Sequence, residues 1–270
     1  MEVAEAKHTL RLMQRGDGAK KSELYESEED VPPMSEEEQL LYRLTYHEAV
    51  LPPPEPPALK PLSERLSALA ATLGVLGVDS ETLKLPKLEL LALVELRDAC
   101  NVNEWHVGKD SWGDGRLFAS PEEAFGLTVF FRPGEREGTV TEVRLPQNNL
   151  HGALPPSIGF LKSLQSLMLP RNALAGLIPD ELGECLSLTT LDLSSNAFYG
   201  AIPAALGRCL QLGTVILNHN RLSGAVPRTL CACRNLNGIG LMHNFYTEEA
   251  KEEAYQFLTE RFNRQLFKQF

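Results

Sequence analysis

The sequence predicts a right-handed α/β solenoid in which short parallel strands of successive coils line up into one sheet. Asn, Gly and Pro each recur every 24 residues between positions 140 and 246. Each unit also carries Leu or a similar residue at fixed offsets around a short alternating segment, such as Ser166 to Pro170. No unit can bury its apolar edge alone, so the units are expected to stack. The recurring residues are Asn148, Asn172, Asn196, Asn220 and Asn244; Gly152, Gly176, Gly200 and Gly224; and Pro155, Pro179, Pro203 and Pro227.

Each recurring position has a physical reason. Alternation along a strand places Leu167 and Leu169 inward and leaves Ser166, Met168 and Pro170 outward. The chain then turns through a buried bend, where an inward Asn can satisfy main-chain groups that have no ladder partner. Gly permits a conformation or close approach that a Cβ blocks, and Pro stiffens the outer arm where no N–H is needed.

The repeated pattern LxxLxLxxNxLxGxIPxxLG resembles the plant-type leucine-rich repeat. That repeat occurs in receptor-kinase ectodomains, polygalacturonase-inhibiting proteins and many protist proteins. Four full units and a truncated fifth carry the pattern within residues 140–246. The resemblance implies a curved solenoid that binds partners, and it does not name the partner.

Residues 1–61 are expected to form an acidic and proline-rich arm with short helices. Ser35 and Glu38 make a capping box for a helix that ends near Val50, and its apolar side carries Leu40, Leu41 and Leu44. The prolines within residues 51–61 predict an extended spacer. Because this helix has nothing in its own segment to pack against, we expect it to dock on this chain's solenoid or on another protein. A ligand for a domain that binds proline-rich segments is the alternative.

Residues 62–139 are predicted to cap the front of the solenoid with two helices, within 63–77 and 88–101, and a hairpin. The hairpin pairs residues 127–131 with 139–145. Trp105 and Trp112 could cover the apolar end of the first coil. This region resembles the N-terminal cap of such repeat proteins, but Ala124 stands where that pattern has a further Trp. Seven positions are predicted to be buried in the helices: Leu66, Leu69, Leu73, Leu90, Leu93, Val94 and Leu96.

Residues 247–270 are predicted to form a helix that closes the other end. Thr247 is its expected N-cap, because a hydroxyl there can accept from the first turn. The face that would pack on the last coil carries Ala250, Ala254, Phe257, Leu258, Phe262 and Leu266.

The net charge and the lack of long apolar segments limit the classes of partner and the cellular compartment. The net charge is −10, and the first 138 residues hold 15 Lys/Arg against 26 Asp/Glu. This argues against nucleic acid and anionic membranes. Residues 1–30 have no apolar signal core, and the run 66–78 is shorter than the roughly 20 residues of a membrane crossing. We therefore expect an intracellular, soluble protein with no signal peptide or transmembrane segment.

The five cysteines predict buried thiols rather than a disulfide framework. Cys185, Cys209 and Cys233 share one inward phase, while an odd count and the absence of paired capping cysteines make a secreted scaffold improbable. Cys231 and Cys233 have one intervening residue and no second pair, so a zinc site is not expected.

Catalytic motifs are missing from the sequence. It has no phosphate-binding Gly-rich loop, Cys-x-x-Cys pairs, nucleophile elbow or His-Glu-x-x-His segment. His219 and His243 share an outward phase on adjacent coils, but two histidines without a third ligand predict solvated surface. We therefore expect no enzymatic activity, no cofactor and no metal.

The outward strand positions are the predicted partner-binding face. They mix small polar residues with Met168, Ile216 and Met242, which suits a protein partner better than nucleic acid. A solvated sheet with no ligand is the alternative. The predicted partner-binding residues are Arg144, Gln147, Met168, Arg171, Asp192, Ser194, Ile216, Asn218, His219, Met242 and His243.

These features predict a non-catalytic interaction scaffold or structural subunit of a large intracellular assembly, cytoskeletal or ciliary, with the arm docking on neighbours. The expected partners are other proteins of a multi-subunit assembly, with no nucleic acid and no membrane insertion. The alternative is a ligand-recognising leucine-rich-repeat module of the receptor or inhibitor type.

Overall fold

The computed structural model describes residues 60–75, 83–113 and 116–262. The predicted helix between Ser35 and Val50, with Leu40, Leu41 and Leu44, lies outside the described residues. So do most of the proline-rich spacer and the chain beyond residue 262. The predictions for these segments, and the predicted domain boundaries, stay predictions.

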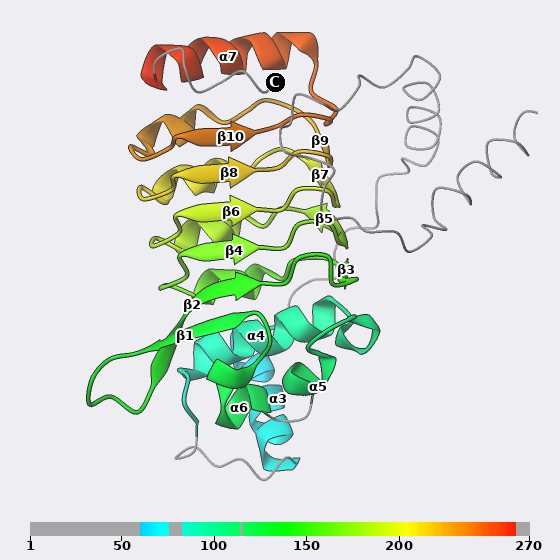
Figure 1. The fold of residues 1–270 in the computed structure, drawn as a ribbon, viewed down its shortest axis with the longest axis vertical. Coiled ribbons are helices and arrows are strands. Elements are labelled where there is room, and N and C mark those ends of the chain that lie inside the picture. The colour runs from blue at the N-terminus through cyan, green and yellow to red at the C-terminus, as the bar shows by residue number, and fades with distance from the viewer. Residues whose placement is uncertain (1–59, 76–82, 114–115, 263–270) are drawn as a thin grey trace, which may run out of the picture. The chain divides into compact units, whose positions relative to one another are not determined.

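Five parallel strands, one from each coil, form the main sheet along the stack of coils (Figure 1). Strand β1 pairs antiparallel with the first of them, as the predicted hairpin requires, with a bulge between Thr128 and Val129. The strand order is β1-β2-β4-β6-β8-β10. The strands are β1 (Leu127–Phe131), β2 (Gly138–Arg144), β4 (Ser166–Met168), β6 (Thr190–Asp192), β8 (Thr214–Ile216) and β10 (Gly238–Gly240).

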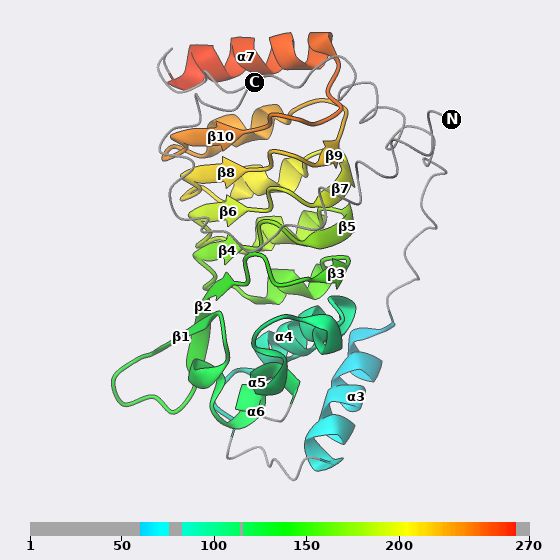
Figure 2. The same cartoon turned by 45° about the vertical axis from the view of Figure 1, so that its right-hand side comes forward.

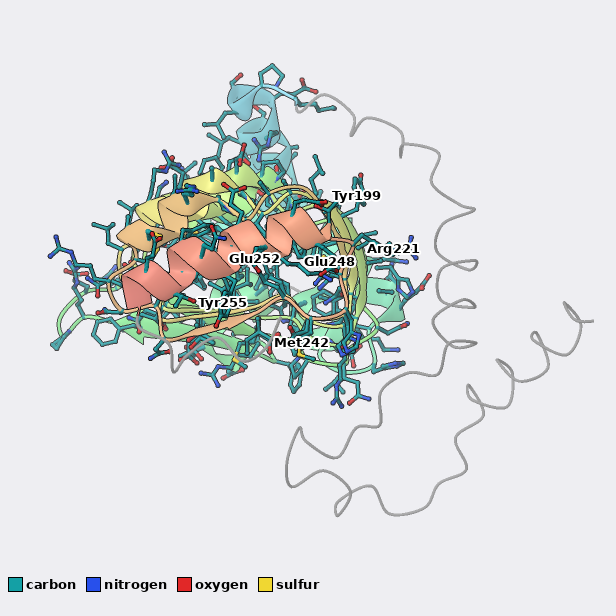
Figure 3. The ribbon with its side chains drawn as sticks, turned by 90° about the horizontal axis from the view of Figure 1, so that it is seen from above. Tyr199, Arg221, Met242, Glu248, Glu252 and Tyr255 are labelled. Atoms are coloured by element: carbon teal, nitrogen blue, oxygen red, sulfur yellow. The ribbon has the colours of Figure 1, made fainter. Side chains whose placement is uncertain are left out.

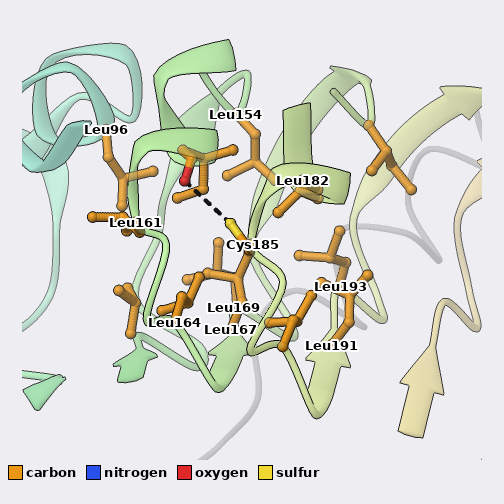
Figure 4. Close-up of a cluster of buried hydrophobic side chains, with 14 of the residues drawn as sticks. Leu96, Leu154, Leu161, Leu164, Leu167, Leu169, Leu182, Cys185, Leu191 and Leu193 are labelled. Atoms are coloured by element: carbon orange, nitrogen blue, oxygen red, sulfur yellow. Dashed lines mark hydrogen bonds between the residues drawn. The ribbon is translucent and has the colours of Figure 1, made fainter. Parts of the chain in front are cut away.

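The inward side chains of the coils form a continuous apolar core. Leu167 pairs in register with Leu191, and both are fully buried, as the alternation predicts. Cys185 lies among these leucines, and its thiol donates to the carbonyl oxygen of Ile158 at 3.4 Å (Figure 4). Full burial of a leucine side chain is worth about 1.5–3 kcal/mol, so the repeated leucines are the main source of stability.

A second sheet, which the sequence analysis did not predict, runs along another side of the coils (Figure 2). Its strands are β3 (His151–Gly152), β5 (Ala173–Leu177), β7 (Ala197–Gly200) and β9 (Arg221–Leu222). The recurring glycines lie within, at the end of or just after these strands and have positive φ, for example 97° at Gly176. The conformation that only glycine adopts readily is therefore the reason for Gly at this phase.

Each recurring proline precedes a short 3-10 helix on the outer side of its coil. Gly183 lies in one of these helices, and a Cβ there would overlap the carbonyl oxygen of Ala205 in the next coil. The second glycine of the repeat therefore serves close packing between coils. The 3-10 helices are η4 (Pro156–Phe160), η5 (Asp180–Glu184), η6 (Ala204–Arg208) and η7 (Arg228–Ala232).

The recurring asparagines form the predicted hydrogen-bonded ladder. The Asn196 amide donates to the carbonyl oxygens of Leu169 at 2.9 Å and Leu193 at 3.1 Å. Its Oδ1 accepts from the N–H of Leu174 at 3.0 Å. One side chain thus joins two coils through groups that the strands leave unpaired.

The front cap packs helix α4 (Lys87–Ala99) against η4 of the first coil, with α3 (Leu62–Val75) beside α4. Leu66 is half-buried, and the other six predicted helix positions are buried. Glu89 of α4 is also buried, and its carboxylate accepts from the Thr139 hydroxyl at 2.7 Å and the Val140 N–H at 2.8 Å. This carboxylate fastens the cap to β2.

Short elements complete the cap between α4 and β1. The two tryptophan rings meet edge to face, with centroids 5.2 Å apart, and both are buried. Trp105 Nε1 donates to the Cys100 carbonyl, and Trp112 Nε1 to the Phe125 carbonyl. Ala124, where a further Trp was expected, is buried as well. The elements are η2 (Val102–Glu104), α5 (Lys109–Gly113), α6 (Arg116–Ala119) and η3 (Pro121–Glu123).

Helix α7 (Glu248–Phe262) lies on the last coil (Figure 1). Thr247 caps it as predicted, because its Oγ1 accepts from the Ala250 N–H at 3.2 Å. Ala254, Phe257 and Leu258 are buried, and Ala250 is half-buried. In the described segments, none of the helices has both the length and the apolar character that a membrane crossing needs.

Candidate functional site

The register of the main sheet aligns the predicted partner-binding residues in rows across the coils. One row contains Arg144, Met168, Asp192 and Ile216, which the strand pairing places side by side. Neighbouring strands are about 4.8 Å apart, so each row presents adjacent side chains to a partner. Gly240 ends this row and contributes no side chain.

The centre of this row is an acid between two apolar side chains. Met168 and Ile216 are half-buried, while Asp192 is only 8% exposed. Its Oδ1 accepts from the Ser194 N–H at 3.0 Å and the Ser194 hydroxyl at 2.7 Å. Asp192 occupies the row that its phase predicts, but its side chain is almost completely buried instead of exposed. The short side chain turns back to Ser194, which leaves the two apolar neighbours as the more accessible groups.

Ser166 was also expected to be outward, and it is 5% exposed. Its hydroxyl has no hydrogen-bond partner among the described residues. At the β2 end of the row, Arg144 forms an ion pair with Glu142 of the same strand, Nε to Oε2 3.0 Å. Their charges partly cancel, so this end of the row is polar but nearly neutral.

The next row follows the strands and contains Ser194, Asn218 and Met242. Asn218 Oδ1 accepts from the Met242 N–H at 2.8 Å, so the side chain links two coils. Met242 is 37% exposed and lies beside helix α7 in the view of Figure 3. Met168, Ile216 and Met242 together give the face its apolar character.

The last row has an unusual backbone conformation. All of its residues are in the left-handed region, with φ between 50° and 57°. Each N–H of this row, up to the fourth coil, donates to a carbonyl of the next coil, as Arg171 does to Ser194 at 2.9 Å. The coil-to-coil hydrogen bonds and the Asn that follows hold this conformation. The residues of the row are Gln147, Arg171, Ser195, His219 and His243.

His219 and His243 stack face to face, with ring centroids 4.2 Å apart and planes 16° apart. Partial burial lowers the pKa of His219, and the neighbouring His243 lowers it further. The neutral form of His219 is therefore favoured. Because the ring planes are nearly parallel, the in-plane lone pairs do not converge on one point, so this arrangement does not form a chelate. In the described part of the chain, no three His, Cys, Asp or Glu residues gather as a metal site needs.

The inward thiols of Cys185 and Cys209 are weakly reactive. Burial raises the pKa of Cys185 to about 12 and that of Cys209 to about 11. Both thiols donate to main-chain carbonyls instead of pairing with each other. A thiol with so high a pKa is a poor nucleophile at neutral pH.

Two surface features were missed by the sequence analysis. Leu186 and Leu210 are 57% and 54% exposed on the outer side of adjacent coils. They share a phase with Lys162 and Arg234, so the repeat alignment could have revealed them. The second feature is an open pocket of about 190 Å³ at the last coil, lined by Leu241, Met242, His243, Asn244, Tyr246 and Lys251. No sequence signal marks it.

Comparison with known proteins agrees with this architecture. Residues 187–209 match the family described as Leucine Rich Repeat. The ectodomain of BIR2 from Arabidopsis thaliana is 28% identical over 59% of this chain and 81% of that chain, with a TM-score of 0.53. The ectodomain of the receptor kinase SOBIR1 from the same plant is 24% identical over 63% and 89% of the two chains, with a TM-score of 0.51, and shows the fold alone. No curated protein matches the sequence.

One further solved structure is an ectodomain with a bound molecule. It is that of the receptor kinase GASSHO1/SCHENGEN3 from Arabidopsis thaliana in complex with CASPARIAN STRIP INTEGRITY FACTOR 2. It is 27% identical over 58% of this chain and 18% of that chain, with a TM-score of 0.53.

The protein is a leucine-rich-repeat solenoid, and its repeats are of the plant type. Such a solenoid is typically a non-catalytic module for protein interaction.

Proposed function

We propose that the protein recognises a protein or peptide ligand on the outward face of its main sheet, as a receptor-type or inhibitor-type leucine-rich-repeat module does. The observation that carries this proposal is the apolar set Met168, Ile216 and Met242, placed within otherwise polar rows. A sheet that only meets water has no need of these side chains, whereas a protein interface uses apolar anchors surrounded by polar groups.

The charges of the face favour a protein over nucleic acid. Residues 139–246 carry 7 Lys/Arg against 5 Asp/Glu, so the block is nearly neutral. Arg144 is already paired with Glu142. A phosphate backbone would need a continuous basic stripe, which these rows do not provide.

The comparisons support ligand recognition more than assembly. Two of the structures named above, at 27% and 28% identity, are ectodomains, and the one of the receptor kinase GASSHO1/SCHENGEN3 is in complex with another molecule. They give no support to the multi-subunit intracellular assembly that the sequence analysis favoured, or to its intracellular location. The predicted contact of Leu40, Leu41 and Leu44 on the arm is a second proposed surface, and these residues lie outside the described part.

Paired variants on opposite faces test the proposal. Met168→Asp with Ile216→Asp places two charges in the centre of the proposed interface. Leu186→Asp with Leu210→Asp is the matched control on the outer side, where both leucines are more than half exposed. Affinity capture followed by mass spectrometry should identify partners that the first double variant loses and the control keeps, with both variants melting near the unaltered protein.

Three outcomes bear on the proposal. Partners lost equally by both double variants would contradict the assignment to the main sheet. Partners kept by both would do the same. A chain lacking residues 1–61 that loses the partners, while Met168→Asp with Ile216→Asp keeps them, would assign recognition to the arm instead.

A further inference from the structure

Within the described part of the chain, some groups of the last coil have no hydrogen-bond partner, although the equivalent groups of every earlier coil have one. The N–H groups of Leu145, Leu169, Leu193 and Leu217 donate to carbonyls of the following coil at 2.8–3.0 Å. Leu241 is the next residue in this series, and its N–H makes no hydrogen bond with the described residues. The edge of β10 away from β8 is likewise unpaired by any strand that the structure describes.

The same interruption occurs two residues later. The N–H groups of Gln147, Arg171, Ser195 and His219 donate to carbonyls of the following coil, the last of them to Met242 at 2.8 Å. His243 is next in this series, and residues 60–75, 83–113 and 116–262 offer its N–H no acceptor. Two N–H groups that lie two positions apart and have no acceptor among the described residues have the spacing with which a parallel strand pairs.

The Asn ladder also ends here with a vacancy on its acceptor side. The Leu217 carbonyl accepts from both Asn220 and Asn244, at 3.2 Å and 2.9 Å. The Leu241 carbonyl accepts only from Asn244, at 3.0 Å, within the described chain. The Leu222 N–H donates to Asn244 Oδ1, but the N–H of Tyr246, one coil later, finds no such amide among the described residues.

The open pocket lies at these unpaired groups. Leu241, His243 and Tyr246 all line it, and Lys251 borders it from α7. Its volume of about 190 Å³ is below the range of roughly 300–1,000 Å³ that is usual for small-molecule sites, and it suits one or two side chains. The Tyr246 side chain is 6% exposed, and its hydroxyl has no partner among the described residues.

The end of β10 reaches solvent at Met242 and His243, which are exposed, while Ile239 and Leu241 are 5% and 3% exposed. Helix α7 packs on the 3-10 side of the last coil, where Arg228 of η7 pairs with Glu253 at 3.1 Å. Figure 3 shows α7 across the end of the stack, with Met242 to one side of it. The outward residues of β10, Gly238 and Gly240, carry no side chains that would obstruct an approaching chain.

We propose that the β10 edge and this pocket bind an extended segment of another protein, which runs parallel to β10 and carries an Asn or Gln. Two main-chain carbonyls of the segment accept from the Leu241 and His243 N–H groups. The carboxamide then donates to the Leu241 carbonyl and accepts from the Tyr246 N–H. A carboxylate lacks the donor for this arrangement, and Lys or Arg lacks the acceptor. Strand addition of this kind uses main-chain bonds for affinity and a pocket for specificity.

A peptide copied from the fourth coil provides the test. Residues 213–221, GTVILNHNR, make these contacts with the preceding coil, since Ile216 and Asn218 carbonyls accept from Leu193 and Ser195, and Asn220 donates to Leu193. Fluorescence anisotropy should show saturable binding of this peptide to the full-length protein. The same peptide with Asn220→Ala should bind about tenfold more weakly, because each well-made hydrogen bond is worth about 1.4 kcal/mol or less.

Amide hydrogen exchange locates the binding. The Leu241 and His243 amides should gain protection when the peptide is added, while those of Leu217 and His219 should not change. Equal affinity of the two peptides, or protection elsewhere, overturns the proposal. Binding only to a chain that ends at Phe262 would make residues 263–270 the occupant, and protection that rises with protein concentration alone would make it a second copy. Either result also overturns the proposal.

Discussion

Replacing Asn196 by alanine should lower the free energy of unfolding by about 1–3 kcal/mol, the cost of one buried donor left without a partner. The Leu174 N–H would lose its acceptor, Asn196 Oδ1, at 3.0 Å. The carbonyls that Asn196 serves keep other donors. Leu169 still accepts from Asn172 at 3.0 Å, and Leu193 from Asn220 at 2.9 Å. The expected loss therefore comes mainly from a single amide and not from the whole set of bonds.

Ser195→Ala is the matched control for this substitution. Ser195 is adjacent and half-buried, and only its main-chain N–H is needed, which donates to Asn218 at 2.8 Å. A change within about 0.5 kcal/mol is expected for it. Urea unfolding followed by circular dichroism measures both variants, and exchange of the Leu174 amide should accelerate only in Asn196→Ala. Equal destabilisation by the two variants, or an unchanged Leu174 amide, would refute the ladder as the source of stability.

Three other predictions concern the packing between coils, the buried carboxylate of Glu89 and the reactivity of the cysteines. Gly183→Ala should destabilise by about 1–3 kcal/mol because its Cβ overlaps the next coil, whereas Gly213→Ala, with its nearest neighbour at 3.5 Å, should unfold near the unaltered protein. Burial raises the pKa of Glu89 above 4.5, so the folded state binds this proton more tightly. The free energy of unfolding should therefore fall as the pH rises from 4.5 through the raised pKa. The midpoint of urea unfolding should fall over this pH range in the unaltered protein, and the Glu89→Gln variant should lack this contribution. In native alkylation followed by mass spectrometry, half-buried Cys231 should react before Cys185, whose pKa is about 12, and a mapped disulfide between Cys185 and Cys209 would contradict this order.

The repeat period was enough to predict the main sheet. The alternating leucines and the inward Asn of each unit are both explained by a short strand that ends in a buried bend. Leu167, Leu169 and Asn196 have the environments that their phase predicts. The second sheet was missed because its strands are only two to five residues long. At that length the side chains show no alternation, and the strands exist only through pairing between coils.

The candidate face was harder to predict than the core. Its rows could be assigned from phase, but the burial of Asp192 depends on a bend of its side chain toward Ser194. The left-handed row could not be recognised either, since Gln, Arg, Ser and His have no common preference for positive φ. The link from Glu89 to β2 joins residues 50 positions apart and leaves no local pattern.

The two ends of the solenoid are completed in different ways, and this determines where a strand can be added. At the front, β1 pairs with β2, and Asn148 exchanges hydrogen bonds with the N–H and carbonyl of Val107. The first coil therefore has its partners within the cap. At the back, α7 covers the 3-10 side, while Leu241 and His243 keep N–H groups without acceptors among the described residues. An N–H without a protein acceptor costs little free energy only if water can reach it, and Leu241 and His243 both line the open pocket, which water can enter. A segment that displaces this water with carbonyls and an amide side chain would repeat contacts that each earlier coil already makes.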